Sequence, residues 1–336
     1  MEYLPGYVDH YHSGELERRS EALESRLVAC DICPRECRVN RLEGEPGFCR
    51  SGTLPAVATV CAHYGEEPVL SGSRGSGTIF FAGCNMRCLY CQNHQISQEW
   101  TGQTSQVMDC HALAERMLYL QDELGCHNIN LVSPSHFVPQ IVKTVLEAVP
   151  MGLRLPLVYN TNAYDSIATL KTLDGIISIY LPDLRYASDD WAERLSQVKG
   201  YVDRARRAIR EMYRQVGNLT IDGSGVAWQG LIVRHLILPY DLAGSEQSLT
   251  WLADELSSAV TVSIMSQYLP VYRAHREPLL GRTITAVEYE AVVGVLSKIG
   301  LKNGWVQEMG AAREYVPDFE QDDHPFSNRD DCRNGK

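Results

Sequence analysis

Short apolar runs alternate with longer segments of helical period from residue 77 onward. Six runs are apolar throughout, which is typical of strands buried on both faces of a parallel sheet. They cover residues 78–83, 128–133, 155–161, 175–183, 230–239 and 259–267. Amphipathic segments lie between or after these runs, at 110–124, 137–149, 189–216, 245–259 and 285–299. The alternation predicts a repeated βα unit, arranged either as a parallel barrel or as a doubly wound sheet.

Polar residues at the ends of the runs favour the barrel. A thiol-rich loop follows the first run, Ser133-Pro134-Ser135-His136 the second, Asn160-Thr161-Asn162 the third, and Asp183 closes the fourth. The strand ends of a barrel surround one site, whereas a doubly wound sheet gathers its ligands at one switch point. We therefore predict a partial (β/α)6 TIM-type barrel at residues 77–312. It is preceded by a cysteine-rich N-terminal segment, 1–76, and followed by a polar, disordered tail, 313–336.

Charge and composition narrow the class of protein. The chain has 31 basic and 42 acidic residues, and its net charge of −11 argues against general nucleic-acid binding. Its first twenty residues lack a basic segment followed by an apolar one, so we expect no export and reduced thiols. No run approaches the roughly 18 apolar residues of a membrane helix. These features predict a cytoplasmic protein with neither a membrane nor a nucleic acid as partner.

Three cysteines follow the first apolar run, in "GCNMRCLYCQN". Cys84, Cys88 and Cys91 are spaced C-x3-C-x2-C, and Tyr90 precedes the last of them. Three thiolates neither complete a tetrahedral zinc site nor ligate all four irons of a cubane. One metal position stays open, which is typical of a catalytic centre. A structural zinc site completed by His94 or by a distant cysteine is the alternative.

This loop resembles the signature of radical S-adenosylmethionine (SAM) enzymes. Further segments match in order between about residue 27 and about residue 310, among them "CDICPRECRVNRLEGEPGFC", "YNTNAYDS", "IYLPDLRYA" and "NGWVQE". In these the chain is similar to the PflX-type proteins, relatives of pyruvate formate-lyase activating enzyme. The resemblance implies that the three cysteines hold a 4Fe–4S cluster whose fourth iron is chelated by SAM. It also implies reductive cleavage of SAM to a 5′-deoxyadenosyl radical that removes a hydrogen atom from the substrate.

The resemblance also implies roles for residues near the thiol loop and the second strand. Tyr90 is expected to pack against adenine, with a plain core position as the alternative. Ser133 and Ser135 stand where relatives often hold a Gly-Gly-Glu-Pro segment that receives the SAM amino group. No carboxylate follows this strand here. The serines therefore either contribute to SAM binding, together with Pro134 or His136, or cap the following helix.

Later strand ends supply the remaining expected contacts. Asn160 and Asn162 are expected to bind the ribose or the carboxylate of SAM, with Asx turns as the alternative. Asp183 precedes an arginine, Arg185, where activating enzymes have a lysine, and it is expected either to serve SAM or substrate or to form a buried ion pair. Arg234 lies where relatives use an arginine near SAM, and the neighbouring His235 is expected to face the core.

The resemblance implies a protein substrate, in the first instance a glycyl radical enzyme, and a flavodoxin or ferredoxin-type electron donor. Arg207, Arg210 and Arg214 share one helix face, which either docks an acidic donor or pairs with acidic neighbours such as Glu211. A peptide- or metabolite-modifying enzyme is the alternative. Peptide modifiers often have a cysteine-rich C-terminal extension, whereas here only Cys332 follows Cys126. A non-catalytic iron–sulfur carrier or scaffold would not need SAM contacts at the other strand ends.

A second thiol group precedes the barrel. Cys30, Cys33, Cys37 and Cys49 are spaced C-x2-C-x3-C-x11-C, and four thiolates are enough to close a complete shell. They predict a second metal site, and both zinc and a second 4Fe–4S cluster satisfy the spacing. Cys61 is an alternative ligand. Disulfides are not expected in a reducing compartment.

Overall fold

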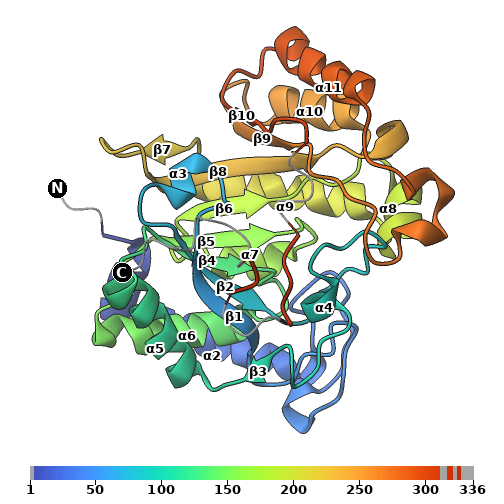
Figure 1. Ribbon diagram of the computed structural model, residues 1–336. Coiled ribbons are helices and arrows are strands. Elements are labelled where there is room, and N and C mark those ends of the chain that lie inside the picture. Colours follow the sequence, from blue (N-terminus) through green and yellow to red (C-terminus); the bar gives the residue numbers. More distant parts are fainter. Residues whose placement is uncertain (1–3, 311–315, 321–323, 327–336) are drawn as a thin grey trace.

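The computed structural model describes residues 4–310, 316–320 and 324–326. Its centre is a twisted parallel sheet with helices packed outside it (Figure 1). The parallel strands, in spatial order, are β2 (Ser76–Phe81), β4 (Ile129–Val132), β5 (Leu157–Thr161), β6 (Ile179–Pro182), β8 (Ala227–Leu236), β9 (Thr261–Met265) and β10 (Gly304–Val306). The six predicted runs coincide with the strands from β2 to β9, which confirms the βα repeat.

The sheet does not close into a full barrel. Beside β2 lies β1 (Ala56–His63), which is antiparallel to it, and then β3 (Gln106–Val107) at the edge. The other edge is β10, and β7 (Thr220–Ile221) pairs with β8 off the main path. Among the described strands, none joins β3 to β10, so the predicted partial barrel is confirmed as an open one.

The helices follow the predicted amphipathic segments. Their bounds are α1 Gly6–His12, α2 Glu15–Ser25, α3 Pro68–Ser71, α4 His94–Ser97, α5 Cys110–Leu118, α6 Val138–Met151, α7 Ile167–Thr172, α8 Asp189–Ser196, α9 Tyr201–Val216, α10 Ser245–Glu255 and α11 Ala286–Ile299. The single segment expected at 189–216 is divided into α8 and α9. Gln197 and Gly200 both adopt left-handed backbone conformations between them, which an α-helix does not accommodate.

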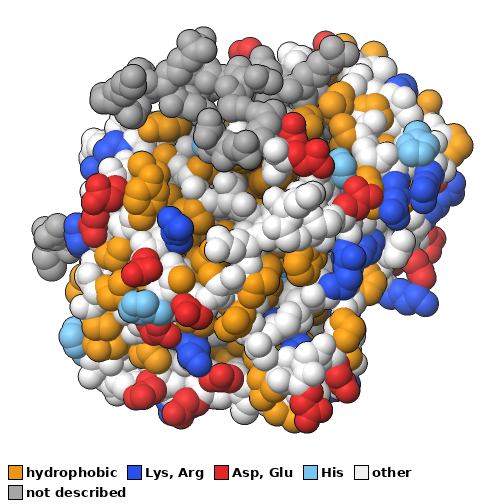
Figure 2. Space-filling model, turned by 60° about the horizontal axis from the view of Figure 1, so that its bottom comes forward, with side chains coloured by type: hydrophobic (Ala, Val, Ile, Leu, Met, Phe, Trp, Pro, Cys, Tyr) orange, Lys and Arg blue, Asp and Glu red, His pale blue; other side chains and the backbone are white. Residues whose placement is uncertain are grey.

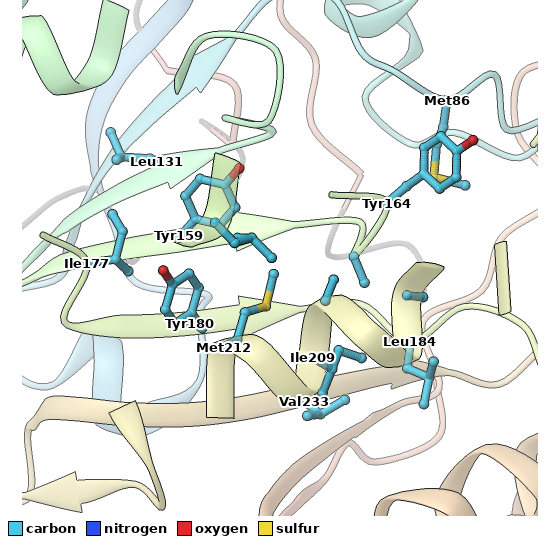
Figure 3. Close-up of a cluster of buried hydrophobic side chains, with 14 of the residues drawn as sticks. Met86, Leu131, Tyr159, Tyr164, Ile177, Tyr180, Leu184, Ile209, Met212 and Val233 are labelled. Atoms are coloured by element: carbon cyan, nitrogen blue, oxygen red, sulfur yellow. The ribbon is translucent and has the colours of Figure 1, made fainter. Parts of the chain in front are cut away.

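In each strand, alternate side chains face the helices, and the others face the inside of the partial barrel. Leu131, Tyr159 and Tyr180 belong to one buried cluster with Ile209 and Met212 of α9, and Figure 3 shows the two tyrosines next to Met212. All five side chains are completely or almost completely buried. Because both faces of the strands are covered, the strands are apolar throughout, as the sequence pattern predicted.

The short helix α3 closes the bottom of the inner space. Its Leu70 packs in one cluster with Val158, Ile179, Leu181 and Ile232 of the inner face. The sequence analysis did not predict this helix, because four residues are too few for a periodic pattern. It comes from the N-terminal segment, so that segment contributes to the inside of the barrel.

A buried arginine joins the cysteine-rich segment to the strand ends. Arg41 is 1% exposed and donates from Nη1 to the carbonyl of His136 at 2.8 Å and from Nη2 to that of Gly52 at 2.6 Å. His136 in turn bonds through Nε2 to the carbonyl of Ala82 at 2.9 Å. These bonds connect the residues before the barrel with the loops that follow β2 and β4.

Part of the predicted tail is packed against the sheet. Phe319 is 8% exposed and lies in one cluster with Phe80, Cys61 and Val132. Gln95 accepts a hydrogen bond from the Phe319 main chain at 2.9 Å. The rest of the predicted tail, apart from residues 316–320 and 324–326, lies outside the described residues, as Cys332 does. The division of the chain into an N-terminal segment, a barrel and a tail at residues 76 and 312 stays a prediction.

Gly230 provides a test of the packing at the start of β8. It has a φ of 127°, and a Cβ there would lie 2.4 Å from the Cα of Leu219. We expect Gly230→Ala to lower the free energy of unfolding by about 2–4 kcal/mol, from backbone strain and overpacking. Gly223→Ala is the matched control, since nothing lies within 4 Å of its added Cβ. Urea denaturation measures both, and equal midpoints would contradict the assignment of strain to Gly230.

Candidate functional site

A cavity of about 810 Å³ occupies the inner side of the sheet at the carboxyl ends of the strands. The sheet contributes side chains from β1 across to β10: His63, Phe80, Val132, Asn160, Asp183, Arg234, Leu236, Ser263, Met265 and Trp305. Tyr90 and Cys91 of the thiol loop also line it. The predicted gathering of polar residues at one rim therefore corresponds to a real cavity.

The thiol loop begins directly after β2 and is held in place by the N-terminal segment. Gly83 has a φ of 82°, and a Cβ there would lie 2.7 Å from the carbonyl oxygen of Cys49. Only glycine allows this close approach without strain. Arg87 donates to the carbonyl of Phe48, and its guanidinium lies 4.4 Å from the Phe48 ring centroid. The two thiol-bearing segments are thus in direct contact.

The sulfur of Cys84 receives polar hydrogens from two sources. It lies 3.4 Å from the amide nitrogen of Met86 and 3.5 Å from Nδ2 of Asn162. The sulfurs of Cys88 and Cys91 lie 3.1 Å and 3.2 Å from serine hydroxyls, those of Ser196 and Ser97 respectively. Polar donors around each sulfur suit a thiolate that carries negative charge and ligates metal.

Burial is the main influence on the protonation of these thiols. It raises the pKa of Cys84 and of Cys91, and each is raised further by the neighbouring Cys88. Arg185 opposes the shift at both. Thiols lose their protons when they ligate a metal, and the positive metal then stabilises the thiolates that burial alone disfavours. A metal cluster is therefore a suitable partner for this group of cysteines. Three such donors beside an open cavity leave room for a further ligand on the metal.

Tyr90 is a buried core aromatic that also lines the cavity. Its ring is 4% exposed and meets that of Tyr268 edge to face, with 5.7 Å between centroids. Its hydroxyl lies 2.5 Å from that of Tyr186, yet the side chain lines the cavity. Tyr90 is therefore a fixed aromatic wall next to the thiols.

A chain of ion pairs crosses the inner face. Arg234 donates from Nε to Asp183 at 2.7 Å and from Nη2 to Oδ1 of Asn160 at 2.6 Å. Arg185 donates to the second oxygen of Asp183 at 2.6 Å. Burial alone would lower the pKa of Arg234, but Asp183, Glu67 and Glu66 outweigh it and raise that pKa. The predicted ion pair is present, and it also borders the cavity.

Two carboxylates that the sequence analysis missed complete this chain. Glu66 and Glu67 lie between β1 and α3 and project into the same cavity. Glu66 accepts from Arg234 at 3.3 Å and from Nδ2 of Asn130 at 3.0 Å. Burial raises the pKa of both, that of Glu67 to about 7, while Arg234 opposes the shift. The sequence signal for these two residues is "GEEP", residues 65–68, but this stretch does not follow any of the six predicted strands, where functional residues were expected.

Other predicted residues stand behind the cavity wall. Ser135 is buried and lies 3.1 Å from the hydroxyl of Thr161. Ser133 has a φ of 58°, and its amide donates to the carbonyl of Asn160. Neither serine caps α6, which begins after Phe137 without a side-chain cap. Asn162 forms the Asx turn that was the alternative, through a 2.9 Å bond from the Tyr164 amide. His235 faces the core, as expected, with both ring nitrogens hydrogen-bonded.

The N-terminal thiols form a second, closed group. All four, Cys30, Cys33, Cys37 and Cys49, line a void of about 10 Å³. Burial raises the pKa of Cys33, and the other three thiols raise it further. The sulfur of Cys37 accepts from the Phe48 amide at 3.4 Å. The predicted group is therefore brought together in space.

Neither thiol group has the geometry of a finished single-ion site. In the part of the chain that the structure describes, no three His, Cys, Asp or Glu side chains are spaced to hold one metal ion. A cubane places each thiolate on a different iron atom, so its ligands stand farther apart than those of a single ion.

The described helices include none that is long and apolar enough to cross a bilayer.

Comparison with known proteins was made on both sequence and structure. A family model described as the radical SAM superfamily matches residues 78–223. Two proteins of Methanocaldococcus jannaschii are similar. Uncharacterized protein MJ0674 is 31% identical over 85% of this chain and 79% of its own length. Uncharacterized protein MJ0808 is 38% identical over 23% of this chain and 27% of its own length.

Among solved structures, two crystal structures of the FeFe-hydrogenase maturase HydG match with a TM-score of 0.46, one of them from Carboxydothermus hydrogenoformans. Their identities are 14% and 13%, and they cover 71% and 70% of this chain. The matches cover 52% and 54% of the HydG chains, so this chain spans about half their length. The family model, by contrast, begins within β2 and includes all three cysteines of the thiol loop, and on this ground the chain belongs to the radical SAM superfamily.

Proposed function

We propose that the protein generates a radical on another protein, as glycyl-radical-activating enzymes do. Membership of the radical SAM superfamily implies a 4Fe–4S cluster, bound SAM and reductive cleavage of that SAM. When bound, the cluster and SAM supply the electron transfer and the hydrogen-abstracting radical. The residues described above bind these groups, exclude water and hold the substrate in position.

Cys84, Cys88 and Cys91 are the proposed ligands of the cluster. The hydrogen bonds from Met86, Ser196 and Ser97 to their sulfurs orient the thiolates and disperse their charge. Arg185 lies 4.0 Å from the sulfur of Cys88 and contributes a positive charge beside the group. The chain therefore stabilises an anionic site at the edge of the cavity.

Tyr90, Asn160, Asp183 and Arg234 are the proposed SAM contacts, since all four line the cavity. Ser133, Ser135 and Asn162 receive a supporting role in this proposal. Their observed bonds fix the loops after β4 and β5. Asn162 also reaches Cys84, so it positions the thiol loop.

The observation that carries the proposal of a protein substrate is the open side of the barrel. The cavity extends from His63 and Tyr64 of the β1 side to Trp305 and Glu308 at the β10 side. These two edges are not joined by a described strand. The sheet is therefore open on this side, where Phe326 stacks on His63 and lines the cavity, and a partner segment that approaches the thiol loop laterally passes or displaces that ring.

Electron delivery by a flavodoxin or ferredoxin-type protein is part of the proposal, but the arginine face of α9 does not support docking there. Arg210 pairs with Glu255 at 2.5 Å, and Arg214 pairs with Glu211 at 2.8 Å. This is the paired arrangement that was the alternative. Figure 2 shows Lys and Arg side chains gathered at the right of that view, with Asp and Glu side chains among them, despite the net charge of −11. Such a gathering attracts acidic donors.

For the N-terminal thiols, we propose a separate metal site that holds residues 30–49 in place. The four sulfurs line one void, and this loop-rich stretch has little apolar area of its own. Four thiolates suit either zinc or a second cluster in number, although in the described residues their spacing is not that of a single-ion site.

The first prediction for this function concerns the cluster. Cys88→Ala should abolish 5′-deoxyadenosine formation in anaerobically reconstituted protein, because one iron loses its ligand. The unfolding midpoint should change little, since the loop follows the end of β2 and is not itself part of a strand. Cys126→Ala is the control, being a buried cysteine of the core outside both groups. Normal product formation by Cys88→Ala would rule out the assignment.

The second prediction concerns the substrate class. Reconstituted protein with SAM and a strong reductant should form 5′-deoxyadenosine faster when the high-mass fraction of a cell lysate is added. Protease treatment of that fraction should remove the stimulation. Stimulation by the low-mass fraction alone would instead indicate a peptide- or metabolite-modifying enzyme. A protein that binds a cluster but never cleaves SAM would be a carrier or scaffold.

The third prediction concerns the N-terminal thiols. The triple variant Cys84→Ala, Cys88→Ala and Cys91→Ala should retain metal, because the second group keeps all four of its ligands. Metal and sulfide analysis distinguishes the two options: zinc indicates a structural site, and iron with sulfide indicates a second cluster. Complete loss of metal, together with rapid alkylation of the four thiols, would show that no such site exists.

A further inference from the structure

Glu67 is a buried carboxylate of the cavity with one oxygen atom that finds no partner in the part of the chain that the structure describes. It is 8% exposed and lines the cavity, and its Oε2 is buried without a hydrogen-bond partner. A buried carboxylate oxygen without a partner is costly, so it points to a missing donor.

The neighbouring charges are already matched to one another. Arg185 and Arg234 both contact Asp183, and Arg234 also contacts Glu66. Glu66 accepts further bonds from the amides of Asn130 and Asn160. Arg234 also attracts Glu67, but when all three carboxylates are ionised they face only two guanidinium groups, so the set carries one negative charge in excess.

The local fold does not account for the side chain of Glu67. It is the residue before α3, and its carbonyl accepts the amides of Leu70 and Ser71 at 2.8 Å and 3.1 Å. The carboxylate itself makes no capping bond. The main chain of Glu67 begins the helix, so the inward carboxylate is not needed for that purpose.

Depth in the barrel distinguishes this position from the thiol loop. Glu66 contacts Asn130, which pairs with Thr78 in the middle of β2, whereas the thiol loop follows the end of β2 at Phe81. Two or three residues of strand correspond to about 7–10 Å. Glu66 also contacts Asn160 and Arg234, which lie nearer the carboxyl ends of the strands, so the Glu66-Glu67 pair reaches from the floor of the cavity up to the proposed SAM contacts.

We propose that Glu67 binds a protonated amine of the substrate, at the floor of the cavity. The inference rests on the proposed function, because it takes the occupant of the floor to be the substrate. An ammonium group supplies both the missing hydrogen-bond donor and the positive charge that balances the carboxylate. The Oδ1 of Asn130, on the same inner face, is another buried acceptor without a partner. A lysine side chain or a terminal amine of a peptide has the required chemistry.

The test measures binding of a small cationic probe, without catalysis. The probe is n-butylammonium, and 1-butanol is its uncharged counterpart, both titrated into cluster- and SAM-loaded protein at pH 8 and followed by calorimetry. At that pH the carboxyl is ionised and the amine remains protonated. We expect the wild-type protein to bind the cation at least about tenfold more tightly than the alcohol. Equal affinity for the two would overturn the proposal without any variant.

Two variants assign the effect to this residue. Glu67→Gln should reduce the affinity for n-butylammonium to that for 1-butanol while leaving SAM affinity, measured by equilibrium dialysis, unchanged. Glu21→Gln is the matched control: it removes the same charge from an exposed position on α2 and should change neither affinity. Unaltered cation binding by Glu67→Gln, or a loss of SAM affinity in its place, would contradict the proposal.

Failure of this inference is separable from failure of the proposed function. If the wild-type protein forms 5′-deoxyadenosine but does not prefer the cation, only the role of Glu67 is wrong. If it prefers the cation through Glu67 but never cleaves SAM, the proposed function is wrong, and the binding site stands as a property of the cavity.

Discussion

The position of Arg234, largely shielded from solvent on the inner face of a parallel sheet, is the constraint around which the site is organised. A guanidinium in such a place is tolerated only when carboxylates and amides meet it closely. Asp183 at the end of β6, Asn160 of β5 and Glu66 of the N-terminal segment all do so, at 2.7, 2.6 and 3.3 Å. Because these partners come from separate parts of the chain, the arginine fixes how the strands and the N-terminal segment meet.

Much of the fold could be predicted because the strands are covered on both faces. Runs such as 155–161 are apolar without alternation, and the structure shows why: Tyr159 faces the helices while Val158 faces the inner space. The break between α8 and α9 could not be read in the same way. The amphipathic pattern of residues 189–216 continues across this break. The break occurs at Gln197, which takes a left-handed conformation that glutamine rarely adopts and that the pattern does not reveal.

The candidate site was predictable where a residue stood at a strand end, as with Asp183 and the three cysteines. Glu66 and Glu67 could not be found by that rule, because they reach the cavity from the opposite end of the barrel through α3. A polar "GEEP" stretch before a short apolar run reads as an exposed turn. Only the packing of Leu70 against the sheet shows that the stretch is inside.

Phe319 bears on the order in which the chain acquires its structure. It joins Phe80, Val132 and Cys61, residues that are synthesised far earlier, and bringing such distant segments together carries the entropy cost of closing a long loop. On the ribosome, β1 and β2 therefore emerge and pair well before this aromatic ring is available to cover them. In the finished molecule Gln95 holds this contact in place, because it accepts a hydrogen bond from the Phe319 amide and donates one to the Asp318 carboxylate.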